Sequence, residues 1–280
     1  MAVMLEESLA RKLREKRIVF TVTTGRSGTA YLTTLFGYVK GVDAFHEPEP
    51  EFRHVLRRVQ QDPQEAKEFM ARQKLPAIAA CDRGIYVETS HLFCKGFLEP
   101  TLALGIVPDL IVHSRPHRQV AVSLYRMGTI PGRTPKALQF YLSPEDPDVL
   151  PLENWQRLHD YQLCFWYCLE IERRAARYQE MYERIGGRVV QTSLGELKTT
   201  RGYLKMLRTL DIQRPSLFNL LRHKRNSRFK INESLIKKRP VELPEDLQAL
   251  EEEVIALSGS RREGPTEKPA TPNGTGGQPT

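Results

Sequence analysis

The chain has 280 residues, is 40% hydrophobic and carries a formal net charge of +8. This length and apolar content fit one large globular domain or two small ones and argue against a disordered chain, and the positive charge suggests an anionic partner. Its four cysteines show no zinc-like spacing and are too few for a disulfide framework, so a reducing, cytoplasmic setting is expected, with Cys164 and Cys168 as small core residues. No apolar run is long enough for a signal peptide or a membrane span.

Taken in chain order, apolar stretches alternate with segments of helical spacing. A short amphipathic helix comes first, and the apolar stretch "IVFTVT" then opens a series of strand and helix pairs. This alternation predicts an α/β fold with a P-loop-like central parallel sheet and helices on both faces. The predicted strands are 18–23, 84–89, 108–116 and 187–193, and the predicted helices are 1–17, 27–39, 62–73, 91–104, 118–127, 153–183 and 243–257.

Two stretches lack a clear period. Residues 128–151 are rich in proline and too long for an idle connection, so we interpret them as an active-site lid. Residues 258–280 are rich in Gly and Pro and hold no large apolar side chain, which predicts a disordered tail after a single domain over 1–257.

The stretch "TTGRSGTAYL", residues 23–32, joins the first predicted strand to its helix. A loop of small residues at this place directs backbone N–H groups toward one point and suits a phosphate or sulfate. Gly25 and Gly28 allow tight turns, and Arg26 adds a forked cation. The chain has no Gly-Lys pair and no G-x-G-x-x-G after a strand, which argues against ordinary ATP, GTP and dinucleotide sites. By itself the loop is also compatible with an ordinary strand-to-helix turn.

A second candidate anion site lies in "LIVHSRPHRQVAVSLYR", residues 110–126. Arg115 stands just beyond a predicted strand end, and Ser123 follows eight residues later on the next helix. Both can face one ligand, although Arg115 could instead pair with a carboxylate. Two anion-binding points at neighbouring strand ends suit a nucleotide with phosphates at two separate positions.

Together these motifs resemble those of the PAPS-dependent sulfotransferases. "TTGRSGTAYL" looks like the 5′-phosphosulfate loop in the Arg-Ser-Gly-Thr form of bacterial, carbohydrate and tyrosylprotein enzymes, and "SRPHRQVAVSLY" looks like the 3′-phosphate motif. The resemblance implies a sulfotransferase fold, PAPS (3′-phosphoadenosine 5′-phosphosulfate) as donor, adenosine 3′,5′-bisphosphate as product, and no metal. It also implies which residues bind the donor: Arg26, Ser27, Gly28, Thr29 and Ala30 at its 5′ end, and Arg115 and Ser123 at its 3′-phosphate.

Sulfuryl transfer needs a general base for the acceptor's proton and a cation where charge builds on the leaving oxygen, a role that suits Arg26. Glu47, 21 residues after Arg26 in "AFHEPEPEF", resembles the glutamate of the carbohydrate and tyrosylprotein enzymes, and we expect it to be the base. A capping or salt-bridged Glu is the alternative. His91, in "VETSHLF", resembles the histidine of the cytosolic enzymes and is the rival base, or else a core or capping residue.

The segment 222–239 holds eight Lys or Arg against one Glu and carries nearly the whole positive excess. The resemblance suggests that Arg225 or Lys224 closes over the 3′-phosphate, and the alternative is a solvated basic loop. We expect a small-molecule or carbohydrate acceptor, no nucleic acid and no membrane span. The competing classes are a P-loop-type nucleotide kinase without its lysine and a non-catalytic anion- or nucleic-acid-binding protein.

Overall fold

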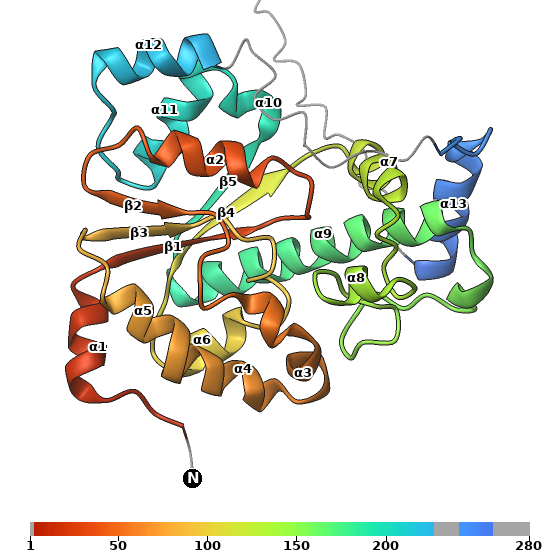
Figure 1. Cartoon of the computed structure of the whole chain (residues 1–280), viewed down its shortest axis with the longest axis horizontal. Helices are drawn as coiled ribbons and strands as arrows, with labels where there is room; N and C mark the ends of the chain where they lie inside the picture. The colour runs from red at the N-terminus through yellow and green to blue at the C-terminus, as the bar shows by residue number, and fades with distance from the viewer. Residues whose placement is uncertain (1–2, 227–240, 260–280) are drawn as a thin grey trace, which may run out of the picture.

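The computed structural model describes residues 3–226 and 241–259. Its centre is a five-stranded sheet with the order β2-β3-β1-β4-β5, in which every neighbouring pair is parallel. Helices cover both faces of the sheet (Figure 1), so the predicted α/β architecture is confirmed. The strands are β1 Arg17–Val22, β2 Val42–Phe45, β3 Ile85–Glu88, β4 Asp109–Ser114 and β5 Val189–Ser193.

The central strand β1 is buried on both faces. Ile18 and Phe20 belong to one hydrophobic core and Val19 to the other, because successive side chains of a strand point to opposite faces. Such a strand appears in the sequence as an unbroken apolar run, which is how it was predicted. The register sets Phe20 beside Glu88 of β3 and beside Leu110 of β4.

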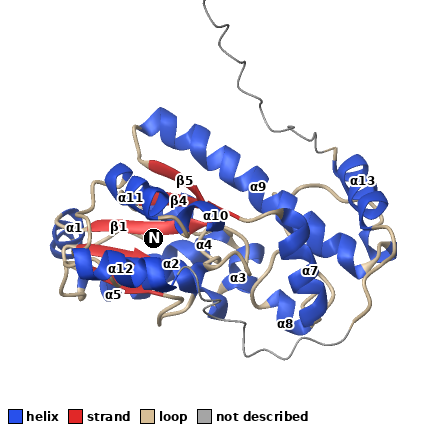
Figure 2. Ribbon diagram, turned by 90° about the horizontal axis from the view of Figure 1, so that it is seen from above, coloured by secondary structure: helices blue, strands red, loops and turns tan. Residues whose placement is uncertain are grey.

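The helices form two layers and a group beyond the strand ends. Helices α2 and α10–α12 cover one face of the sheet, and α1, α3–α6 and α9 cover the other (Figure 1). Helices α7, α8 and α13 gather beyond one end of the strands (Figure 2). The bounds are α1 Glu7–Arg14, α2 Thr29–Phe36, α3 Leu56–Gln61, α4 Pro63–Phe69, α5 Leu75–Ala79, α6 Leu98–Ala103, α7 His117–Met127, α8 Pro135–Leu138, α9 Asp160–Ile185, α10 Leu194–Leu197, α11 Thr200–Thr209, α12 Leu217–Asn226 and α13 Leu247–Ser258.

The predicted helices 91–104 and 153–183 begin later than expected, and one strand was not predicted. The helix expected over 91–104 is helical only in α6, because residues 91–97 form turns that include Gly96 at φ +102°. The long helix begins at Asp160 rather than Glu153, since His159 caps it through its side chain. Strand β2 was not predicted, because its four residues form no apolar run.

The segment 128–151 is anchored to the body of the protein. Tyr141, Leu142 and Leu150 in this segment are buried, and the Arg57 guanidinium forms a bidentate ion pair with Asp146 at 2.9 and 3.1 Å. A second contact runs from the Trp166 indole N–H to the Leu150 carbonyl. The segment is therefore packed in this structure, and its predicted movement as a lid stays a prediction.

The four cysteines are free thiols. Cys164 and Cys168 are buried in the core as expected, Cys94 is buried there as well, and Cys81 is partly buried. Within the described residues, no helix is both long and apolar enough to cross a membrane. Most of the basic segment, residues 227–239, lies outside the described residues, and so does most of the predicted tail, residues 260–280.

Candidate active site

The residues expected to carry the chemistry meet at the carboxyl ends of the parallel strands. The loop 23–28 leaves β1, and Arg115 follows β4 directly. From β1 the chain passes toward β2 at one edge of the sheet, and from β4 it passes toward β5 at the other. Ligands of open α/β sheets bind where the strand order reverses in this way, so the crevice between β1 and β4 is the expected place.

Two residues of the β1–α2 loop have a left-handed backbone. Arg26 has φ 66° and Gly28 has φ 104°. Gly28 is the N-cap of α2 and has no side chain to cap the helix, so the first N–H groups of α2 are left for an outside acceptor. The neighbouring Gly25 is packed closely, since a Cβ built there would lie 2.9 Å from Cε1 of Tyr141.

Buried polar side chains support the loop from below. The Thr23 hydroxyl lies 2.8 Å from the Ser27 hydroxyl and 2.5 Å from the His113 carbonyl. Burial lowers the pKa of His113 to about 4, so its neutral ring donates from Nε2 to the Ser27 carbonyl at 3.1 Å. Ser27 is fully buried, and its side chain is engaged in the support of the loop.

The two predicted anion motifs come into direct contact. Nε of Arg26 donates to the Ser123 hydroxyl at 3.2 Å, and Arg115 donates to the Arg26 carbonyl at 2.7 Å. Neither guanidinium pairs with a carboxylate of residues 3–226 or 241–259; Arg115 instead bonds the Gln119 side chain. Burial, and then the nearby charge of Arg26, lower the pKa of Arg115. Two neighbouring cations without a carboxylate partner among the described residues favour the binding of an anion between them.

Glu47 follows β2 and reaches the same end of the sheet. Its backbone is left-handed, with φ 50°, and its side chain is 21% exposed. Oε1 is buried, lies 3.4 Å from Nε2 of His91 and forms no hydrogen bond within the described part of the chain. The two candidate bases thus face each other.

His91 is in turn bonded to Lys95. The Lys95 Nζ lies 2.7 Å from Nδ1 of His91, donates to the Phe140 carbonyl, and lies 5.1 Å from the ring centres of Tyr141 and Tyr167. Burial lowers the pKa of Lys95 to about 7, and burial with the Lys95 charge holds the pKa of His91 well below its ordinary value.

No protein-family model and no curated protein matches this chain. Among solved structures, the sulfotransferase domain from the curacin biosynthetic pathway is similar, with a TM-score of 0.52 over 86% of this chain and 96% of that domain. The chain has that domain's fold. At 15% identity, the likeness extends to the fold alone.

Other predicted residues lie at the site in less direct ways. The Thr29 hydroxyl is 3.4 Å from Nε2 of His46, and Ala30 lies in the first turn of α2. Arg225 belongs to α12, but its side chain is outside the described residues.

Sequence reasoning missed the aromatic wall of the site. The backbone N–H of Gly25 donates to the hydroxyl of Tyr167 of α9 at 3.2 Å. Tyr141 contacts both His91 and Tyr167, with ring centres 5.6 and 4.9 Å apart. Tyr167 lies in an apolar stretch whose pattern is typical of core residues. His113, a histidine within an otherwise apolar strand, was the available signal for the loop support.

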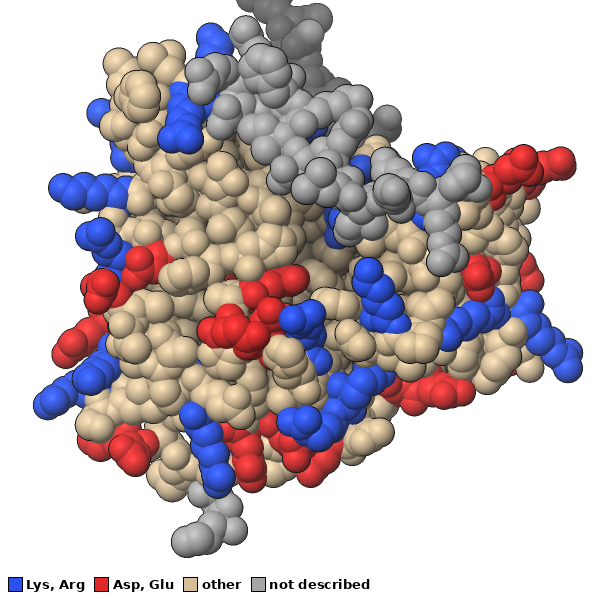
Figure 3. Space-filling view, viewed as in Figure 1, with Lys and Arg blue, Asp and Glu red and all other residues tan. Residues whose placement is uncertain are grey.

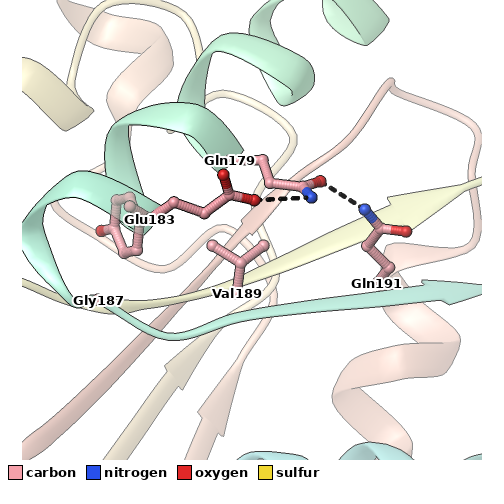
Figure 4. Close-up of a pocket in the computed structure, with 6 residues that line it drawn as sticks. Gln179, Glu183, Gly187, Val189 and Gln191 are labelled. Carbon is pink, nitrogen blue, oxygen red and sulfur yellow. Dashed lines mark hydrogen bonds between the residues drawn. The ribbon is translucent and has the colours of Figure 1, made fainter.

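Two surface features lie away from this site: a hollow beside β5 and the distribution of charged side chains on one face. A hollow of about 450 Å³ lies at the amino end of β5 against α9, lined by Gln179, Glu183 and Gln191 among others (Figure 4). On the face shown in Figure 3, basic and acidic side chains are interspersed over the described surface. That distribution gives no support to a nucleic-acid surface on this face.

Proposed function

We propose that the chain is a sulfotransferase that uses PAPS, with Glu47 as general base and a hydroxyl or amine of a small molecule or carbohydrate as acceptor. The observation that carries the proposal is the contact between Arg26 and Ser123, because it joins two anion motifs that are 97 residues apart. A donor with one anionic group at its 5′ end and another at its 3′ position matches two joined anion sites.

The residues present fit such a donor. The open N–H groups at the start of α2 and the Arg26 guanidinium would hold its 5′ end, and Arg115 with Ser123 would hold its 3′-phosphate. Bound PAPS would supply the sulfuryl group. Arg26, which has no carboxylate partner in the described chain, is available to stabilise negative charge on the leaving oxygen.

The hydrogen bonds around His91 favour Glu47 as the base. Below about pH 7, where Lys95 is charged, it can only donate, so it occupies the lone pair of Nδ1, and the proton of neutral His91 then lies on Nε2. The Nε2 atom lies 3.4 Å from Glu47 Oε1. With a proton on Nε2 and Lys95 bonded to Nδ1, His91 has no free lone pair to accept a proton. Glu47 would therefore take the proton of the acceptor while His91 orients its carboxylate.

A thermal-shift comparison tests the proposal. Adenosine 3′,5′-bisphosphate should raise the melting temperature without magnesium, and Arg115→Ala should remove the effect while the exposed Arg184→Ala keeps it. A response to Mg-ATP in place of the bisphosphate would support a nucleotide kinase instead. No response to either nucleotide, together with tight, salt-sensitive DNA or RNA binding, would sink the enzyme proposal. Labelled PAPS incubated with a metabolite extract would then identify the acceptor.

A further inference from the structure

A buried ion pair lies beneath the turn that carries Glu47. Nζ of Lys74 is 3.2 and 3.1 Å from the two carboxylate oxygens of Glu88, and the side chains are 1% and 0% exposed. The Tyr86 hydroxyl donates to the same carboxylate at 2.6 Å. A pair buried so completely loses about as much free energy by desolvation as it gains by attraction, so stability alone is a weak reason for it.

Lys74 connects this pair to the candidate base. Its Nζ also donates to the carbonyl of Pro48, the residue after Glu47, at 3.2 Å, so its three N–H groups have three acceptors. Lys74 ends a π-helical turn, Met70–Lys74, between α4 and α5, and its Nζ lies 4.4 Å from the ring centre of Phe52. Turns of this kind are rare and occur often at functional sites.

The Glu47 turn is thereby held on both sides by two consecutive residues at the end of β3. The backbone N–H of Thr89 donates to the Phe45 carbonyl at 3.0 Å, and Glu88 holds the Pro48 carbonyl through Lys74. Between these two points Glu47 adopts a left-handed backbone, which is unfavourable for a residue with a Cβ and persists only when its surroundings impose it.

We propose that Lys74 and Glu88 are positioning residues, which fix the Glu47 carboxylate where an acceptor must meet it. The inference rests on the proposed role of Glu47 as base. The proline ring restricts φ of Pro48, so a fixed Pro48 carbonyl leaves the preceding residue few alternatives. The pair acts through this turn and touches neither donor nor acceptor.

The test compares two double variants. Lys74→Met alone would leave Glu88 buried without its cation and could unfold the protein, so Lys74→Met is combined with Glu88→Gln. The control is Arg17→Met with Asp109→Asn, which removes a pair that is 28% and 17% exposed at the first residues of β1 and β4, the end of the sheet opposite the Glu47 turn. Both variants should keep the thermal shift caused by adenosine 3′,5′-bisphosphate.

The decisive readout is the ¹⁵N spectrum of His91, assigned with His91→Gln, because Nε2 of His91 lies 3.4 Å from the Glu47 carboxylate. We expect the Lys74→Met/Glu88→Gln variant to shift or broaden the His91 signals and the control to leave them unchanged. With PAPS and an identified acceptor, kcat should fall about 100-fold with an unchanged KM for PAPS.

Unchanged His91 signals and an unchanged kcat in the Lys74→Met/Glu88→Gln variant would overturn the proposal. A lost thermal shift in that variant would also overturn it, because the pair would then support the nucleotide loop. If the wild-type protein shows no thermal shift, the proposed function fails, and the His91 spectrum still decides whether the pair positions Glu47.

Discussion

The two sides of the candidate site carry charge in opposite ways. On the side of β1 and β4, Arg26 and Arg115 lie together, and neither has a carboxylate partner in the described chain. On the side of β2 and β3, buried cations have partners: Lys74 bonds Glu88, and Lys95 bonds His91 and a carbonyl. The difference suggests a division of labour. The first side is built for an external anion, and the second fixes the position of one carboxylate.

The largest expected effect comes from removing that carboxylate. Glu47→Gln keeps the shape of the side chain but cannot accept the acceptor's proton, so turnover should fall by about 100- to 10,000-fold. The thermal shift caused by adenosine 3′,5′-bisphosphate should persist, because the proposed nucleotide contacts lie on the other side. Radiolabelled sulfuryl transfer from PAPS measures the loss.

Glu49→Gln is the matched control, since Glu49 is two residues away and mostly exposed. It should keep full turnover. An active Glu47→Gln enzyme with an inactive His91→Ala enzyme would assign the base to His91 and reverse the argument from the Lys95 hydrogen bond.

The second effect belongs to the cationic side. Arg115→Ala removes a charged donor from the predicted 3′-phosphate site, and a hydrogen bond to a charged group contributes about 1.5–3 kcal/mol, or roughly 10- to 100-fold in Kd. Isothermal titration with adenosine 3′,5′-bisphosphate measures the loss. Ser123→Ala should have a smaller effect, because it removes a neutral hydroxyl. Equal affinities of wild type and Arg115→Ala would place the anion elsewhere.

A third prediction concerns the wall between the two sides. Gly25→Ala would bring a methyl group to 2.9 Å from Tyr141, a buried side chain that also contacts Tyr167. Overpacking of this kind costs about 1–3 kcal/mol of the free energy of unfolding, measurable by urea denaturation. Gly84→Ala is the control for the loss of a glycine itself, because Gly84, like Gly25, has no left-handed backbone and has open space around the new methyl group. Equal losses for both variants would show that contact with Tyr141 is unimportant.

The sequence predicts the cationic side better than the base side. Arg26, Arg115 and Ser123 belong to local motifs that follow clearly apolar strands. Because parallel strands end at the same edge of a sheet, a parallel sheet predicts that these residues lie close together, as they do. Strand β2, which carries Glu47 to the site, is short and contains Asp43 and Ala44, so it gives no periodic signal.

The partners on the base side are brought together by tertiary packing. Lys74 depends on a π-helical turn, and Tyr167 belongs to the middle of a long helix. A propensity or period in the sequence contains no information on either arrangement. The helix expected from His91 onward failed for a related reason, since His91 and Lys95 bond each other in a turn that ends at a left-handed Gly96.

A fourth prediction is the pH dependence that Lys95 contributes to stability. Because burial lowers its pKa from 10.5 to about 7, the unfolded chain binds a proton between these values that the folded protein does not. The free energy of unfolding should therefore rise with pH in this window, by at most about 1.4 kcal/mol per pH unit from this group. Below about pH 7, Lys95 is charged in both states and contributes no slope.

Lys95→Met removes this contribution, and it also removes the charge that helps to lower the pKa of His91, so the two proteins are compared above pH 7, where wild-type His91 is neutral. The difference in unfolding free energy, wild type minus variant, should increase from pH 7 to 9 in urea titrations. Parallel curves would mean that Lys95 stays charged when folded, which would fix the His91 proton on Nε2 at every working pH. A rising difference would instead mean that His91 can change tautomer above neutrality. The hydrogen bonds on the side of β2 and β3 would then depend on pH, whereas Arg26 and Arg115 on the side of β1 and β4 would stay charged.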